Sequence, residues 1–316
     1  MIYLDSGATT LEKPPAVARA MAQAVGEMSS PGRGNYPASQ KAARTAYDCR
    51  EAAAELFHVP APEQVIFTCN ATHGLNIAIR TLVRPGCRVA VSGYEHNAVT
   101  RVLHSIPGVE IMVADAPLFR PEQTLEGFHT ALRRGVDAVI CNHVSNVFGC
   151  VQPVEELAGL CRRTHTPLIV DASQSAGILP VLLADWGAAF VAMPGHKGLY
   201  GPQGTGLLLC GAEASPLLYG GTGSASRRQT MPIDLPDRLE AGTHNMPGIA
   251  GLLEGLRFVS HAGVERIAQW ERRLTRRAEE GLARLPGVEV FADKTGQGQT
   301  GVLSFCVKGM DCEQVG

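Results

Sequence analysis

Between about residue 65 and residue 210 the sequence alternates short, nearly continuous apolar runs with longer amphipathic stretches. The apolar runs are 65–68, 88–92, 111–113, 138–141, 168–171, 190–193 and 206–209. Runs of this kind are typical of strands that are buried on both faces, and parallel strands need helical crossovers between them. The sequence therefore predicts an α/β fold built on one mostly parallel, seven-stranded sheet with helices on both faces.

Amphipathic segments with apolar residues at three- and four-residue spacing lie between these runs, and we expect helices there. The expected helices cover residues 38–57, 75–82, 125–134 and 154–163. An irregular stretch at 219–247, rich in Gly, Thr, Ser and Arg, follows the last run. Two further helices, 249–261 and 264–285, and a late strand at 302–307 then indicate a smaller α/β domain.

The domain organisation predicted from this order is a large domain at 13–258 and a small domain made of 1–12 and 259–316. Residues 310–316 have the pattern of a helix start, so we expect the small domain to be truncated at its C-terminal end.

The amino-acid composition disfavours some classes of binding partner for this protein. The net charge is −2 and aromatic residues make up 5% of the 316 residues, so a nucleic-acid surface has no support. The amino terminus lacks a signal-peptide pattern and no apolar stretch is long enough to span a bilayer, so we expect a cytoplasmic protein without a membrane partner. The nine cysteines form no CxxC pair, which predicts neither a metal site nor a disulfide framework. In particular, Cys306 alternates within the late strand, and we expect it in the core.

Polar residues follow several of the predicted strands, at the edge of a parallel sheet where ligands collect. Asp171 ends one strand and Lys197 follows another. Pyridoxal phosphate needs a lysine amine for covalent attachment, a carboxylate to keep its pyridine nitrogen protonated, and donors for its phosphate. Lys197 and Asp171 would supply the first two.

The phosphate would bind at the turn formed by Asn70, Ala71, Thr72 and His73, which precedes a predicted helix. Free backbone amides and the helix dipole favour a dianion there, and the Thr72 hydroxyl would assist. Each residue alone has a more ordinary interpretation: a strand-end Asp is often a cap, and a Thr at a helix start usually is one. The ordered combination is what favours the cofactor.

The ordered motifs resemble those of the class V aminotransferase family, and within it the cysteine desulfurases and selenocysteine lyase-like proteins. They are YLDSGATT at 3–10, EHNAV at 95–99, HVSN at 143–146, VDASQ at 170–174, GHK at 195–197 and EAGT at 240–243. The resemblance covers nearly the whole chain and implies the pyridoxal-phosphate-dependent transferase fold of type I.

The resemblance also implies a role for each matching residue. The catalytic residues would be Lys197, which attaches the cofactor, Asp171, which holds the pyridinium nitrogen, and His96, which stacks on the ring. The remaining cofactor contacts would be Asn146 and Gln174 at the ring oxygen, and Ala71, Thr72 and His196 at the phosphate. Thr243 would reach the phosphate of a second subunit, which implies a homodimer with shared sites.

Two departures from the family pattern matter. Pro194 stands where the family often has a Ser that binds phosphate, and a proline has neither a hydroxyl nor an amide hydrogen to donate. Desulfurases also carry a nucleophilic cysteine and substrate-binding arginines, which the resemblance implies to lie beyond Gly316.

The resemblance thus implies an enzyme that converts L-cysteine to L-alanine and passes the sulfur, as a persulfide, to an acceptor protein. Other reactions of the family, namely selenocysteine or cysteine lyase activity or transamination, stay open, as does a non-catalytic scaffold that binds the cofactor. A nucleotide-hydrolysing P-loop is disfavoured because the lysine motif lacks the GxxxxGK[ST] spacing.

Overall fold

The computed structural model describes residues 2–32, 34–224, 227–296 and 298–315. Its main sheet has seven strands in the order β1-β7-β6-β5-β4-β2-β3. The strands are β1 (Val65–Thr68), β2 (Arg88–Ser92), β3 (Glu110–Ala114), β4 (Ala138–Asn142), β5 (Leu168–Asp171), β6 (Phe190–Pro194) and β7 (Gly206–Cys210). Strand β7 is antiparallel to both its neighbours, and the other pairs are parallel. The predicted seven-stranded, mostly parallel sheet is confirmed.

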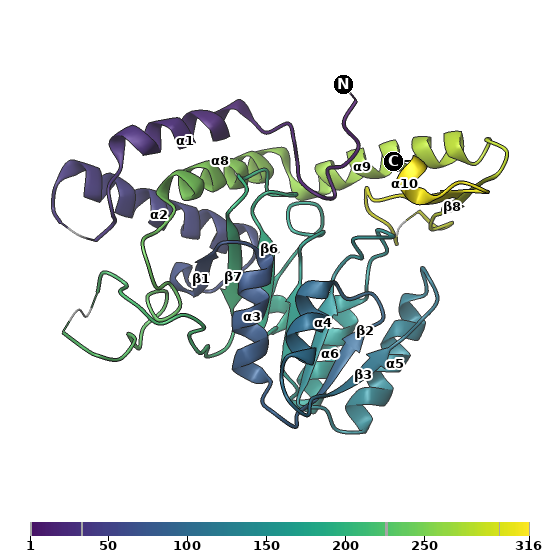
Figure 1. The fold of residues 1–316 in the computed structure, drawn as a ribbon, viewed down its shortest axis with the longest axis horizontal. Helices are drawn as coiled ribbons and strands as arrows, with labels where there is room; N and C mark the ends of the chain where they lie inside the picture. Colours follow the sequence, from purple (N-terminus) through teal and green to yellow (C-terminus); the bar gives the residue numbers. More distant parts are fainter. Residues whose placement is uncertain (1, 33, 225–226, 297, 316) are drawn as a thin grey trace.

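Helices cover both faces of this sheet (Figure 1). They are α2 (Pro37–Leu56), α3 (Ala71–Leu82), α4 (Asn97–His104), α5 (Pro121–Arg133), α6 (Val154–Thr164), the short α7 (Leu183–Trp186) and α8 (Met246–Ala262). Helix α1 (Pro15–Glu27) packs against α8. Helices α3 and α4 contribute to one hydrophobic core, whereas α2, α5, α6 and α8 contribute to the other.

Alternate strand residues enter the two cores. In β4, for example, Val139 packs on the side of α6 and Ile140 on the side of α3. Both side chains have no exposed surface, because successive side chains of a strand point to opposite faces and both faces are covered. This double burial explains why the strands appear in the sequence as continuous apolar runs.

The last part of the chain forms α9 (Val264–Leu282), the antiparallel pair β8 (Val288–Phe291) and β9 (Ser304–Val307), and the short α10 (Cys312–Val315). Figure 1 places it beside the end of the sheet at which the amino-terminal segment also lies. The expectation that Cys306 is a core residue is wrong: Cys306 is exposed, opposite Glu289 on an uncovered face of the pair. Within the described ranges, no helix combines the length and the apolarity that crossing a membrane requires.

Candidate functional site

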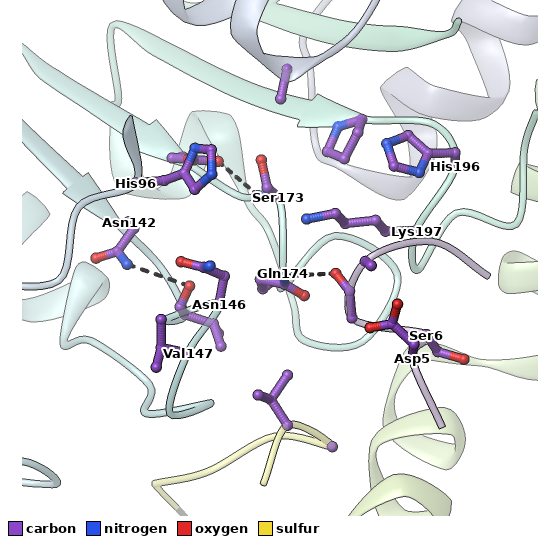
Figure 2. A pocket seen from close by; sticks show the side chains of 18 of the residues that line it. Asp5, Ser6, His96, Asn142, Asn146, Val147, Ser173, Gln174, His196 and Lys197 are labelled. Carbon is purple, nitrogen blue, oxygen red and sulfur yellow. Dashed lines mark hydrogen bonds between the residues drawn. The ribbon is translucent and has the colours of Figure 1, made fainter. Parts of the chain in front are cut away.

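A cavity of about 800 Å³ opens at the carboxyl ends of the parallel strands. Its walls come from the start of α3, the loops after β2, β4, β5 and β6, the amino-terminal residues 4–8, and residues 301–304, which lead into and begin β9. Parallel topology explains the convergence, because the loops that follow parallel strands all lie at one edge of the sheet. Figure 2 shows the side chains that point into this space.

Lys197 lies in the loop after β6 and lines the cavity. Figure 2 shows its side chain reaching toward the side of the cavity where Ser173 and His96 lie. Burial lowers the pKa of the Lys197 amine, and the carboxylate of Asp171 partly opposes that shift. Among the described residues the amine has no hydrogen-bond or ion-pair partner, so it is available as a nucleophile.

Asp171 is the last residue of β5 and is only 4% exposed. One carboxylate oxygen, Oδ1, accepts a hydrogen bond from the backbone N–H of Ser173 at 2.9 Å. The side chain also lines the cavity, next to strand residues Asn142 and Ala192 in the sheet register. Strand packing therefore holds a carboxylate in place, with its second oxygen open to a group in the cavity.

The amino terminus of α3 forms another wall of the cavity. Asn70 caps the helix, and its Oδ1 accepts the N–H of His73 at 2.9 Å. Ala71 and Thr72 line the cavity, and their amides belong to the first turn, where no intrahelical carbonyl is available. This end of the helix is suited to an anion.

His73 does not belong with these residues. The expectation of a free amide is wrong, because Asn70 occupies that N–H, and the ring is turned back toward the Cys69 amide at 3.4 Å. His73 is absent from the cavity lining among the described residues. Asn70 was predicted as part of the phosphate-binding turn but not as the cap of the helix, although an Asn before a helix is a recognisable capping signal.

His96 is the cap of α4, and its Nδ1 accepts the N–H of Ala98 at 3.0 Å. The neutral ring therefore carries its hydrogen on Nε2. Asn146 and Gln174 line the same cavity. Gln174 donates one amide hydrogen from Nε2 to the carbonyl of Gly7 at 3.0 Å and keeps a second for a ligand.

His196 lines the cavity beside Lys197, and its Nδ1 lies 3.0 Å from the Thr9 hydroxyl. Burial, followed by the charges of Lys197 and Lys13, lowers the His196 pKa. The Thr10 hydroxyl contacts the carbonyls of His196 and Lys197 at 2.8 and 2.7 Å. The opening segment of the chain thus holds the loop of the lysine, a role that its sequence did not reveal.

Thr243 lies outside the cavity. It is exposed, in the irregular stretch just before α8. The nearby Glu240 is buried and accepts two hydrogen bonds from the Arg50 guanidinium, at 2.8 and 2.6 Å. His244 lies 2.6 Å from the same carboxylate. This cluster holds the backbone on both sides of Thr243, whose hydroxyl has no hydrogen-bond partner within the described residues.

The side chains in the cavity fit pyridoxal phosphate. The group needs an amine for attachment, a carboxylate for its ring nitrogen and amides for its phosphate. The cavity supplies Lys197, the open oxygen of Asp171 and the first turn of α3. Pro194 also lines it and offers no donor. No cysteine is among the residues described as lining the cavity.

Comparison with known proteins gives consistent results. A family model described as aminotransferase class-V matches residues 2–316. A probable cysteine desulfurase of Methanothermobacter thermautotrophicus is 32% identical over 327 residues, which cover 99% of this chain and 80% of that protein.

Solved structures agree. The apo cysteine desulfurase of Thermococcus onnurineus NA1 superimposes with a TM-score of 0.90 at 29% identity, covering 99% of this chain and 80% of that one. A C-DES variant with glycine covalently linked to its PLP cofactor gives a TM-score of 0.83 at 25% identity, covering 97% and 83%.

Proposed function

The chain belongs to the aminotransferase class-V family, and on that premise we propose that it is a cysteine desulfurase that depends on pyridoxal 5′-phosphate. The reaction would convert L-cysteine to L-alanine and pass the sulfur to a thiol acceptor as a persulfide. The observation that best supports this proposal is that one cavity contains both the Lys197 amine, which has no partner among the described residues, and the Asp171 carboxylate, of which only Oδ1 accepts a described hydrogen bond.

The bound cofactor supplies an electron-withdrawing ring that weakens the bonds at the substrate's α-carbon. The protein's part is to hold that ring and to move protons. Asp171, buried and negatively charged, keeps the ring nitrogen protonated. The amides of Ala71 and Thr72 bind the phosphate, together with His196.

The amine of Lys197 would also act as a base toward a substrate bound in the cavity. Because burial lowers the pKa of its amine, a larger fraction is neutral at physiological pH than in an exposed lysine. A neutral amine can take a proton from the α-carbon of the amino acid and then donate that proton to another atom of the substrate. His96, whose Nε2 faces away from the α4 cap, is the neighbouring group that can exchange a proton with the substrate.

We also propose a homodimer with shared sites. Thr243 is exposed beside a rigid buried cluster, where its hydroxyl can bind the phosphate in a second subunit. Mixing Thr243→Ala subunits with Lys197→Ala subunits should restore one site made of two intact halves. Failure of the mixed protein to bind cofactor better than either variant would contradict sharing.

The reaction is tested by incubating the protein with L-cysteine and a reducing thiol. Equal amounts of L-alanine and sulfide are expected from a chain that includes the nucleophilic cysteine which the resemblance implies beyond Gly316, and Lys197→Ala in that chain should give neither above the level of free pyridoxal phosphate. Pyruvate with ammonia in place of alanine would indicate a lyase, and a keto acid with unchanged sulfur would indicate a transaminase. A protein acceptor would be identified by the transfer of labelled sulfur to it.

A further inference from the structure

A buried carboxyl lies directly behind the cavity, between the ends of β2 and β4. Glu95 Oε1 is 2.6 Å from the hydroxyl of Ser92 and accepts the backbone N–H of Asn142 at 2.8 Å. The same hydroxyl lies 2.9 Å from Oδ1 of the Asn142 side chain. Glu95 Oε2 is buried and, in the described part of the chain, has no hydrogen-bond partner.

Counting hydrogens shows which form of the carboxyl fits. The Ser92 hydroxyl has one hydrogen but faces two acceptor atoms, on Glu95 and on Asn142. If Glu95 is ionised, the hydroxyl donates to it, and Asn142 Oδ1 loses its donor. If Glu95 is protonated on Oε1, it donates to Ser92, and Ser92 donates to Asn142. Only the protonated form satisfies every close contact.

The orientation of the Asn142 amide is settled by its other contacts. Nδ2 donates to the carbonyl of Tyr94 at 2.7 Å and, more weakly, to that of Val144 at 3.4 Å. Tyr94 lies in the loop that leads to His96, and Val144 in the loop that leads to Asn146. Figure 2 shows these three labelled side chains, His96, Asn142 and Asn146, on one side of the cavity. Asn142 therefore links the two loops.

The surroundings of Glu95 favour the protonated, uncharged form of its carboxyl. Burial raises the pKa of Glu95 to about 8, and the negative charge of Asp171 on β5 adds to the shift. Cys141 on β4 also interacts with Glu95, and the pKa of its thiol is itself well above its usual value, again mainly through burial. At neutral pH the thiol is thus uncharged, and Glu95 keeps its proton.

We propose that protonated Glu95 is a positioning residue that sets, through Ser92 and Asn142, the relative placement of the loops carrying His96 and Asn146. The proposal rests on the proposed function, because the family resemblance implies that His96 and Asn146 contact the cofactor ring. Ionisation of Glu95 removes the donor of Asn142, loosens the link between the loops and changes the surroundings of the ring.

The consequence is a transition in the absorbance and affinity of the bound cofactor as the pH rises through about 8. Glu95→Gln keeps the shape of the side chain and cannot ionise. Because one atom faces both the Ser92 hydroxyl and the Asn142 N–H, the amide oxygen of Gln takes that place and accepts from both, as the ionised carboxylate does. This variant should therefore show the high-pH spectrum and affinity already at pH 7 and lack the transition due to Glu95. Glu110→Gln, an exposed carboxyl on β3, is the control and should titrate like the wild type.

The hydrogen bonds that link Glu95, Ser92 and Asn142 form a relay. Ser92→Ala removes the hydroxyl at the centre of this relay and changes only one atom. It should bind the cofactor about fivefold more weakly at pH 7, the cost of about one hydrogen bond, with little pH dependence around 8. An unchanged transition in Glu95→Gln, or unchanged affinity in Ser92→Ala, would overturn the proposal. Loss of covalent attachment in Lys197→Ala tests the proposed function separately, since it does not depend on the relay.

Discussion

Replacing Glu240 by Gln measures what the buried ion pair with Arg50 contributes. The Glu240 side chain is 4% exposed and that of Arg50 is 9% exposed. The carboxylate accepts both guanidinium contacts, a third hydrogen bond from the N–H of Phe67 at 2.7 Å, and a contact with His244. Gln has the same shape but would place an amide hydrogen against a donor and leave the guanidinium without a counter-charge.

Removing one partner of a buried ion pair costs about 3–5 kcal/mol. We expect a loss in that range for Glu240→Gln. An exposed pair contributes about 1 kcal/mol or less, so Glu254→Gln, which breaks the partly exposed pair with Arg257, is the matched control. The double variant Arg50→Met, Glu240→Gln should lose less than Glu240→Gln alone, because it leaves no unpaired charge.

The assay is urea unfolding of each variant at pH 7 and at lower pH. Burial by itself would raise the pKa of Glu240, but Arg50 and His244 outweigh it, so the pKa is lowered. Stability from a carboxyl with a lowered pKa is present above its ordinary value and is lost as the pH falls through the lowered one. The difference between wild type and Glu240→Gln should therefore shrink below about pH 4. A difference under about 1 kcal/mol at pH 7 would refute the reasoning.

Three other predictions concern the site and its surroundings. Asp171→Ala should leave the cofactor attached but lower turnover by orders of magnitude in a steady-state assay, each factor of ten being about 1.4 kcal/mol; normal turnover would refute the role. Gly206→Ala should weaken cofactor binding, measured by absorbance titration, because the new Cβ would lie 2.8 Å from the backbone of Asn70, whereas Gly26→Ala meets nothing within 4 Å and should bind normally. Burial lowers the pKa of His143 to about 4, so stability should fall as the pH drops below 6.5 in the wild type but less in His143→Phe, as measured by unfolding at pH 7 and 5; equal slopes would contradict this.

The sheet could be predicted from the sequence because its strands other than the edge strand β3 are almost entirely buried on both faces. The helices were predicted less completely than the strands. Helix α1 has only Val17 and Ala24 buried, so its apolar pattern is weak, and α4 is short and follows the site loop directly. Strand β8 was missed because its residues are only partly buried, and the hairpin has no continuous apolar run.

Some residues of the candidate site could also be predicted from the sequence, and others could not. Lys197 and Asp171 were recognisable because they directly follow or end strands whose carboxyl ends must converge. The relay of Ser92, Glu95 and Asn142 was not, since it depends on β2 and β4 lying next to each other in the sheet. No local pattern reveals that pairing. The contact of the His73 ring with the Cys69 amide is likewise a feature of the folded turn that the sequence does not reveal.

The most direct test of the account is to map where the cofactor attaches. The protein is incubated with pyridoxal phosphate, reduced with borohydride, digested and examined by mass spectrometry. Lys13, partly buried nearby and also of lowered pKa through burial, is the built-in comparison, with Lys197→Ala and Lys13→Ala as paired variants. The account predicts a pyridoxyl group on Lys197, retained in Lys13→Ala and lost in Lys197→Ala. A pyridoxyl group on Lys13 or on any other lysine, or none at all, would contradict it.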